Sequence, residues 1–263
     1  MVTVPLLAFA DDEPDAVVLC VDGSVGEDPV RFVLDTGAAT CSVPLTPTTR
    51  ALHTASAEGG RGVSGATTGD AVVTLPTLAF GGVTELAVRA SRYTDHPHRR
   101  PLLGMNALGH HRCHFRFRDD ALDIDGHPPE LHSVHHLETG PGGQPMVTAR
   151  FAEQTAYACW DTGASLTVVD AGFADANPRV FQVGDATEGI DATGASVHST
   201  RALMAECVIG GTTFAASACV IVDLGPVNVD LDPPMAMILG TPLLRQANWY
   251  FDFPGGQWGV SRA

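Results

Sequence analysis

Short hydrophobic runs separated by glycine and proline dominate both halves of the chain. Residues 16–21 and 71–75 are examples, and apolar and polar positions alternate around them. A period of two is typical of β-strands with one buried face. The 28 glycines and 18 prolines predict tight turns between many strands. Helical spacing occurs only in short segments, near Met105–Leu108 and Pro242–Gln246, so the pattern predicts an all-β chain with few short helices.

The triplet Asp-Thr-Gly occurs twice, and the same four landmarks follow each copy in the same order. They are a Gly-rich stretch, a Gly-Gly hairpin signal, an apolar run containing Leu-Gly, and an aromatic strand. After Asp35 these are Gly62–Gly69, Phe80–Gly82, Pro101–Leu108 and His114–Phe117. After Asp161 they are Gly189–Ala195, Ile209–Gly211, Met237–Leu244 and Trp249–Phe253. The chain is therefore predicted to be an internal duplication.

The duplication predicts three parts of the chain. Residues 1–125 form an N-terminal lobe with the first Asp-Thr-Gly, and residues 146–263 form a C-terminal lobe with the second. Residues 126–145 are polar and rich in Gly, Pro and His, which predicts an inter-lobe linker.

The two Asp-Thr-Gly-Ala motifs, paired with Leu102-Leu103-Gly104 and Ile238-Leu239-Gly240, resemble the pepsin–retropepsin superfamily of aspartic peptidases. The resemblance covers nearly the whole chain. It implies an all-β, bilobal, pepsin-like acid protease fold with two pseudo-symmetric, β-barrel-like lobes. The motifs are similar to those of retropepsins, which pair two identical chains, but both halves here lie in one chain, as in pepsin.

Asp35 and Asp161 are the only Asp residues that recur in matched surroundings, so they are the candidate catalytic pair. Two facing carboxylates resist double ionisation and hold one proton between them. One can then act as a general base on water while the other donates a proton to a peptide carbonyl. The sequence does not show which of the two carries the proton, and a role as two turn-capping residues is the structural alternative.

The neighbours of both Asp residues fit this scheme. Gly37 and Gly163 allow a sharp turn that brings backbone N–H groups toward the carboxylates. In the superfamily, reciprocal contacts between two threonines brace the Asp loops, and Thr36 and Thr162 match those positions.

Ala38 and Ala164 stand where many pepsins carry Ser or Thr. An alanine removes a hydroxyl donor to the charged carboxylate, which should raise the carboxylate pKa. We therefore expect activity at weakly acidic pH, above the range of digestive pepsins.

The first Gly-rich stretch matches the flap of the superfamily, a hairpin that closes over the substrate. The flap tyrosine of pepsins is missing, since the three tyrosines are Tyr93, Tyr157 and Tyr250. Either one flap or two could close the cleft, and two ordinary exposed hairpins are the alternative. The candidate flap and substrate-binding residues are Gly62, Val63, Ser64, Gly65, Ala66, Gly189 and Ile190.

Nine of the eleven histidines lie between His96 and His136. Their spacing matches no known zinc pattern, so a solvated, His-biased surface is favoured over a metal site. We expect no metal and no cofactor. Ser-His-Asp catalysis is not supported, because no Gly-x-Ser-x-Gly context presents a nucleophile.

Composition narrows the partners. The net charge of −15 argues against nucleic acid, and no apolar run is long enough to span a membrane. Met1–Ala10 lacks a basic region and is interpreted as a first strand, not as a signal peptide. The six scattered cysteines then favour reduced thiols and a cytoplasmic location.

The sequence thus predicts a monomeric aspartic endopeptidase that acts on a peptide or protein substrate. Two alternatives stay open: a non-catalytic peptide-binding module on the same fold, and a processing protease for one specific partner.

Overall fold

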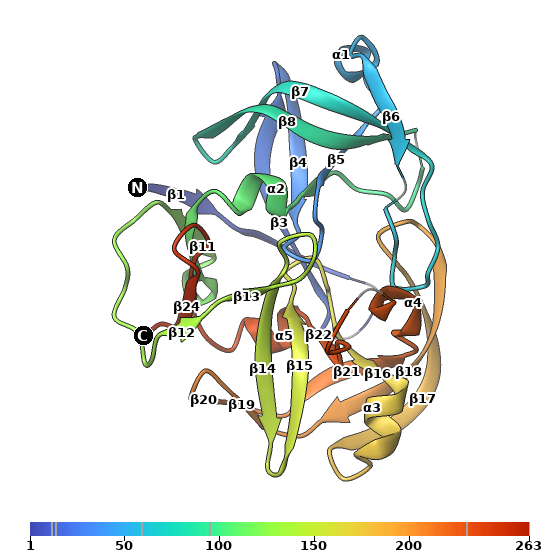
Figure 1. The fold of residues 1–263 in the computed structure, drawn as a ribbon, viewed down its shortest axis with the longest axis vertical. Coiled ribbons are helices and arrows are strands. Elements are labelled where there is room, and N and C mark those ends of the chain that lie inside the picture. The colour runs from blue at the N-terminus through green and yellow to red at the C-terminus, as the bar shows by residue number, and fades with distance from the viewer. Residues whose placement is uncertain (12, 14, 59, 95, 230, 263) are drawn as a thin grey trace.

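The computed structural model describes residues 1–11, 13, 15–58, 60–94, 96–229 and 231–262. It is built mostly of strands, arranged in three sheets with a few short helices. Figure 1 shows an upper lobe in blue and teal and a lower lobe in yellow and orange. The expected all-β, bilobal fold class is confirmed.

The upper lobe is built on one sheet in which eight strands follow the order β2-β3-β4-β9-β5-β8-β7-β6. Their bounds are β2 (Leu7–Ala10), β3 (Val17–Val25), β4 (Asp28–Leu34), β5 (Cys41–Pro44), β6 (Thr54–Glu58), β7 (Asp70–Phe80), β8 (Val83–Tyr93) and β9 (Leu102–Leu103).

The lower lobe repeats this plan in a larger sheet with the order β17-β18-β21-β16-β22-β15-β14-β19-β20, to which β13 is added beside β14. Their bounds are β13 (Glu138–Thr139), β14 (Pro145–Phe151), β15 (Gln154–Trp160), β16 (Thr167–Asp170), β17 (Phe181–Ile190), β18 (Ser196–Met204), β19 (Cys207–Ile209), β20 (Thr212–Phe214), β21 (Ser217–Val222) and β22 (Met237–Leu239).

A third sheet of six strands joins the two halves in the order β1-β11-β10-β23-β24-β12. Its strands are β1 (Val2–Pro5), β10 (Arg112–Arg116), β11 (Ala121–Ile124), β12 (His135–His136), β23 (Trp249–Asp252) and β24 (Gln257–Val260). The two predicted aromatic strands meet here, because Phe115 of β10 pairs with Trp249 of β23. The predicted linker is part of this layer, since β12 within it pairs with β24.

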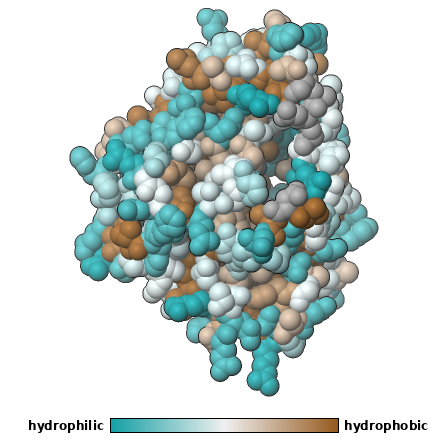
Figure 2. All heavy atoms as spheres, in the orientation of Figure 1, coloured by the Kyte–Doolittle hydropathy of each residue, from teal (hydrophilic) through white to brown (hydrophobic). Residues whose placement is uncertain are grey.

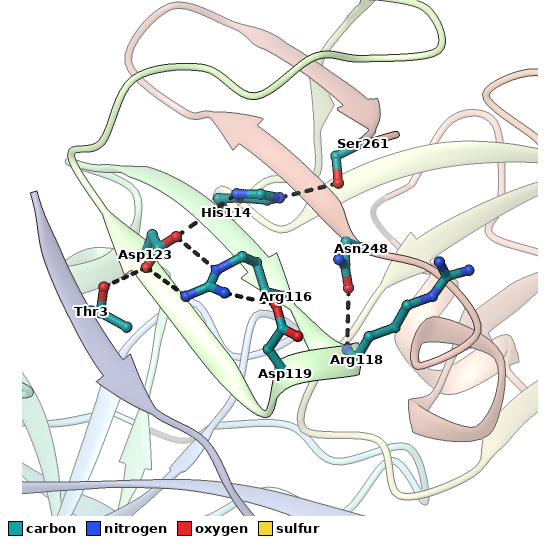
Figure 3. A network of polar contacts seen from close by, with 8 residues as sticks. All are labelled: Thr3, His114, Arg116, Arg118, Asp119, Asp123, Asn248 and Ser261. Carbon is teal, nitrogen blue, oxygen red and sulfur yellow. Dashed lines mark hydrogen bonds and ion pairs between the residues drawn. The ribbon is translucent and has the colours of Figure 1, made fainter. Parts of the chain in front are cut away.

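Polar side chains tie the outer surface of the six-stranded sheet together (Figure 3). The His114 ring lies 3.1 Å from the Ser261 hydroxyl, and Asn248 accepts the Arg118 backbone N–H at 3.2 Å. Arg116 donates to Asp123 at 2.8 Å within the N-terminal half. The first two contacts join residues far apart in the chain, so they hold the two halves in register.

The helices are short, as the sequence predicts. The expected helices after each Leu-Gly are confirmed as α2 and α5, and α5 begins one residue before the predicted segment. The helices are α1 (Pro47–Arg50), α2 (Met105–Leu108), α3 (Ala171–Ala176), α4 (Gly225–Asn228) and α5 (Thr241–Leu244), with a 3₁₀ turn η1 (Phe117–Asp119).

The N-terminal segment differs from the single strand that the sequence predicts. It forms β1 in the inter-lobe sheet and β2 in the upper sheet, with the buried Leu6 between them. The backbone N–H of Leu6 donates to Asp120 O at 2.8 Å, outside either strand ladder. Its apolar side chain enters the core where the chain passes from one sheet to the other.

Both Gly-Gly hairpins are confirmed. Gly81 and Gly82 connect β7 to β8, and Gly210 and Gly211 connect β19 to β20. All four have positive φ angles, which glycine adopts without steric cost. Figure 2 shows the face of Figure 1, with mixed hydrophilic and hydrophobic atoms and a small hollow between the two lobes.

Candidate active site

Each Asp-Thr-Gly loop begins where a central strand ends. In the upper lobe, β4 runs parallel to β9, and the Asp35 N–H donates to Leu103 O at 3.1 Å. In the lower lobe, β15 runs parallel to β22, and the Asp161 N–H donates to Leu239 O at 3.1 Å. The Leu-Gly segments therefore hold both Asp residues by the same backbone bond.

The two Leu-Gly glycines permit this arrangement because they touch backbone. A Cβ atom on Gly104 would lie 2.7 Å from the carbonyl carbon of Thr40. One on Gly240 would lie 2.3 Å from the carbonyl carbon of Leu166. Neither backbone can yield cheaply, so only glycine fits at these two crossings.

The two loops are braced against each other by a reciprocal threonine contact. The Thr36 N–H donates to Thr162 Oγ1 at 3.2 Å, and the Thr162 N–H donates to Thr36 Oγ1 at 3.0 Å. The Thr36 hydroxyl donates to Trp160 O at 2.8 Å, and that of Thr162 donates to Leu34 O at 2.7 Å. Both side chains are fully buried, so each lobe fixes the other's loop.

The carboxyl groups of Asp35 and Asp161 lie next to each other at these loops. Asp161 Oδ1 accepts the N–H of Gly37 from the other lobe at 3.0 Å and that of Gly163 at 2.7 Å. Asp35 Oδ1 accepts the N–H of Ala38 at 2.8 Å. These backbone donors are the groups that the sequence predicts beside the carboxylates.

Glycine is also required at the turns themselves. A Cβ on Gly37 would lie 2.2 Å from Asp161 Oδ2, and one on Gly163 would lie 2.4 Å from Asp35 Cγ. Each loop thus packs its glycine against the carboxyl group of the opposite lobe.

The pKa values of both carboxyl groups are raised. Burial raises the pKa of Asp35 well above its ordinary value, and the adjacent Asp161 charge raises it further. Burial also raises the pKa of Asp161, while N–H groups of Gly163, Gly37 and Ala164 act in the opposite direction. A buried pair of this kind retains a proton that isolated carboxyl groups would lose.

An aromatic cluster supports the loops from below. Trp160, the residue before Asp161, is fully buried. Its ring centroid lies 4.7 Å from that of Phe115 and 4.6 Å from that of Phe251. Phe115 belongs to β10 of the N-terminal half and Phe251 to β23 of the C-terminal half. Residues of both halves therefore pack against the side chain that precedes Asp161.

Two hairpin tips, one from each lobe, contact each other. Residues 60–69 connect β6 to β7, and residues 191–195 connect β17 to β18. Val63 of the first tip packs against an apolar cluster of the lower lobe that includes Cys159 and Ile238. The candidate flap residues of the second lobe are Gly189 and Ile190, at the end of β17. Ile190 is 53% exposed, and a Cβ on Gly189 would contact nothing within 4 Å. Gly62, Val63, Ser64 and Gly65 therefore lie against the opposite lobe. Ala66 bonds within its own tip, and Gly189 and Ile190 lie at the side of the second tip.

Two residues outside the predicted site join it. The Asp191 carboxylate accepts the Ser64 hydroxyl proton across the two tips at 2.5 Å. Gln144 of the linker donates to Gly37 O at 3.3 Å. Alignment of the two tip sequences would have identified Asp191, because it occupies the position that Gly62 has in the first tip. No local sequence signal marks Gln144.

The histidine-rich region is not uniformly a solvated surface, which corrects the sequence interpretation. His111 is buried, with one ring nitrogen 2.8 Å from Asp125 Oδ2 and the other 2.9 Å from Glu85 Oε1. Two carboxylates thus satisfy both ring nitrogens and permit the burial. Within the described residues, no group of three or more His, Cys, Asp or Glu side chains is arranged to hold a metal ion.

Asp123, His114 and Ser261 are three side chains of the types found in a hydrolase triad, and they lie near one another (Figure 3). His114 Nδ1 lies 4.0 Å from Asp123 Oδ2, which is too long for the hydrogen bond that orients a catalytic imidazole. Ser261 is buried at 5% exposure. The trio is structural.

An all-β, bilobal fold with one buried carboxyl loop from each half has the architecture of an aspartic protease. The family model described as gag-polyprotein putative aspartyl protease matches residues 21–110. This segment contains the first Asp-Thr-Gly loop, the first tip and β9, and it ends before the second half. No curated protein matches the chain significantly. The match supports the aspartic protease superfamily and hence a hydrolase of peptides or proteins.

Proposed function

We propose that the protein is an aspartic endopeptidase in which Asp35 and Asp161 together activate a water molecule. The observation that carries the proposal is the reciprocal arrangement of two carboxyl groups, one from each half, with raised pKa values; Asp35 is buried and Asp161 is partly buried. Turn capping alone would not require each loop's glycine to face the opposite carboxyl group.

In this mechanism Asp35 holds the shared proton and Asp161 is ionised. Asp161 receives N–H groups from both loops, and such donors stabilise the charged form. The Asp161 carboxylate removes a proton from water, whose oxygen attacks the peptide carbonyl carbon. Asp35 donates its proton to the carbonyl oxygen. The protonated Asp161 then gives its proton to the amide nitrogen as the C–N bond breaks. Asp35 takes a proton from a hydroxyl of the tetrahedral diol as the carboxylic acid product forms, so the pair again holds one proton.

The test is cleavage of a mixed peptide library by wild type and by Asp35→Asn, with and without pepstatin, a transition-state mimic. We expect cleavage by wild type that pepstatin and the substitution both abolish. Peptide binding without any cleavage would instead identify a non-catalytic binding module. Cleavage of one protein in a cell extract, with none of the library, would identify a processing protease for a specific partner.

We also propose that the protein acts as a monomer without a cofactor, and that it is cytoplasmic. Both Asp loops come from one chain, so a second copy is not needed to complete the pair. All six cysteines are free and buried, which suits a reducing compartment. Among the described residues no helix is long and apolar enough to cross a membrane. Fractionation of cells expressing the natural gene tests the location.

A further inference from the structure

The two hairpin tips are copies of one turn. In each tip, the N–H of the first residue donates to the carbonyl oxygen four positions later, and its own carbonyl oxygen accepts the N–H three positions later. These four hydrogen bonds are each 2.9 Å long. These residues are Gly62, Gly65 and Ala66 in the first tip and Asp191, Gly194 and Ala195 in the second. Ser64 of the first tip is therefore the counterpart of Thr193 in the second, and Gly62 is the counterpart of Asp191.

One carboxylate binds both copies. Asp191 Oδ1 accepts the N–H of Thr193 at 2.9 Å and its hydroxyl at 2.5 Å. Asp191 Oδ2 accepts the N–H of Ser64 at 3.1 Å and its hydroxyl at 2.5 Å. The same pair of donors, from equivalent positions in the two tips, thus converges on opposite oxygens of a single side chain.

The equivalent position in the first tip must be glycine for this to occur. A Cβ on Gly62 would lie 2.1 Å from Asp191 Oδ2. An Asp at both positions would place two side chains in one space and two like charges side by side. Two identical chains could not build this contact on their symmetry axis, because it needs Asp in one tip and Gly in the other.

Further contacts join each tip to the opposite lobe. A Cβ on Gly65 would lie 2.9 Å from Pro226, and Arg61 donates to Pro226 O at 3.0 Å. A Cβ on Gly194 would lie 2.6 Å from the His96 ring. Figure 1 shows the first tip reaching the region of α4 on the right of the molecule, beside the tip of the β17–β18 hairpin.

The surroundings of Asp191 favour its charged form. Burial alone would raise its pKa, but hydrogen bonds from Ser64 and Thr193 hold the pKa below the ordinary value. Hydrogen bonds to a charged acceptor are stronger than neutral ones.

We propose that Asp191 is a positioning residue that latches the two flaps together over the Asp35–Asp161 pair. A peptide can enter only after the bonds from Ser64 to Asp191 break. The gating role rests on the proposed function, but the latch itself is a property of the fold.

The decisive test is hydrogen exchange of wild type and Ser64→Ala, followed by mass spectrometry of peptides from both tips. Ser64 belongs to the first tip only, and its removal leaves every bond within the second tip in place. We expect exchange of residues 191–195 to rise about tenfold, the size expected from loss of one hydrogen bond to a charged group. Unchanged exchange there, in a folded variant, would overturn the latch.

Gly62→Ala provides a second approach, because its methyl group would displace the Asp191 carboxylate. It should raise exchange in both tips. Gly69→Ala is the matched control in the same segment, since its Cβ would meet nothing within 4 Å. Equal exchange in the two variants would contradict the proposal.

The gating role is tested separately by the association rate of pepstatin. If opening limits entry, Ser64→Ala should bind it several times faster than wild type, and Asp185→Asn, an exposed change on β17, should not. Faster exchange with an unchanged association rate would reject gating while retaining the latch. Failure of all forms to bind pepstatin would count against the proposed function, whereas the exchange result would stand.

Discussion

Four residues show how strongly the site constrains residue choice. Gly37 and Gly163 contact the carboxyl group of the other lobe, and Gly104 and Gly240 contact the backbone of their own lobe's Asp loop. At all four positions an added methyl group would overlap atoms that cannot move independently of the carboxyl pair. The glycines therefore set the separation between the carboxyl groups.

At the residue scale, Asp35→Asn and Asp161→Asn should each abolish hydrolysis and leave the fold intact. An amide cannot exchange the proton that the mechanism moves. Loss of less than about a hundredfold in kcat would contradict the assignment, since removal of acid–base catalysis typically costs at least that much.

The same substitutions should change stability in a pH-dependent direction. A folded-state pKa raised above its unfolded value adds stability at low pH that is lost as pH rises through the folded value. Asn should therefore raise the unfolding temperature relative to wild type near pH 7, and the difference should shrink below about pH 4. The expected gain is about 1.4 kcal/mol for each unit by which the pKa is raised. Calorimetry at both pH values measures this gain in stability. An Asn variant less stable than wild type at pH 7 would contradict the claim that burial destabilises the charged carboxyl group.

Ala38→Ser and Ala164→Ser test the role of the missing hydroxyls. A serine donor would favour the charged carboxylate, so the acidic limb of the kcat/KM profile should move down by a fraction of a unit to about one unit. The backbone N–H of Ala38 already donates to Asp35, so the added bond supplements it. A wild-type optimum in the range of gastric enzymes, unmoved by either serine, would sink this explanation.

At the scale of elements, the first flap is anchored by a buried ion pair at the start of β7. Arg99 donates two hydrogen bonds of 2.7 Å to Asp70, with 11% and 9% of the side chains exposed. The Arg99 guanidinium also lies 4.3 Å from the Tyr93 ring centroid. This geometry holds the pKa of Asp70 below its ordinary value, although burial opposes it.

Arg99→Met should therefore destabilise the protein by about 3 kcal/mol at pH 7, because it leaves a buried charge without its partner. The loss should diminish as pH falls through the lowered pKa, where protonation of Asp70 removes that charge. Urea unfolding at pH 7 and at low pH measures both effects. Arg150→Met, at an exposed position of β14, is a control with an expected effect below about 1 kcal/mol.

The His111 contacts belong to the same scale. Both ring nitrogens of His111 face carboxylate oxygens at hydrogen-bond distance, one of Asp125 and one of Glu85. The contact joins β8 to the end of β11.

At the scale of the whole molecule, the inter-lobe sheet brings both halves into one unit. Its three N-terminal strands meet its two C-terminal strands where β10 lies beside β23, and β12 of the predicted linker lies beside β24. The second flap is additionally tied to the N-terminal half, because Glu13 accepts two hydrogen bonds from Arg201 and one from Thr187.

We therefore expect a monomer at micromolar concentration, with full activity per chain. Light scattering coupled to gel filtration gives the mass, to be compared with 27.5 kDa for one chain. Activity that is lost on dilution in parallel with dissociation of a dimer would contradict a complete site within one chain.

Much of this arrangement is determined by the sequence alone. Apolar runs and Gly-Gly turns specify strands and hairpins through local geometry, and the repeated landmarks identify Asp35 and Asp161 as equivalent. The helices after each Leu-Gly follow from the same local signals. The division into residues 1–125, 126–145 and 146–263 stays a prediction from that repeat.

Only the tertiary structure decided which distant residues meet. Ser64 and Asp191 are separated by 127 positions, and neither carries a local signal for the other. The burial of His111 and the separation of β1 from β2 likewise depend on neighbours supplied by other strands. Periodicity and turn chemistry act over a few residues, whereas these contacts depend on how two lobes are oriented, and that orientation is fixed by the shared sheet and the braced Asp loops.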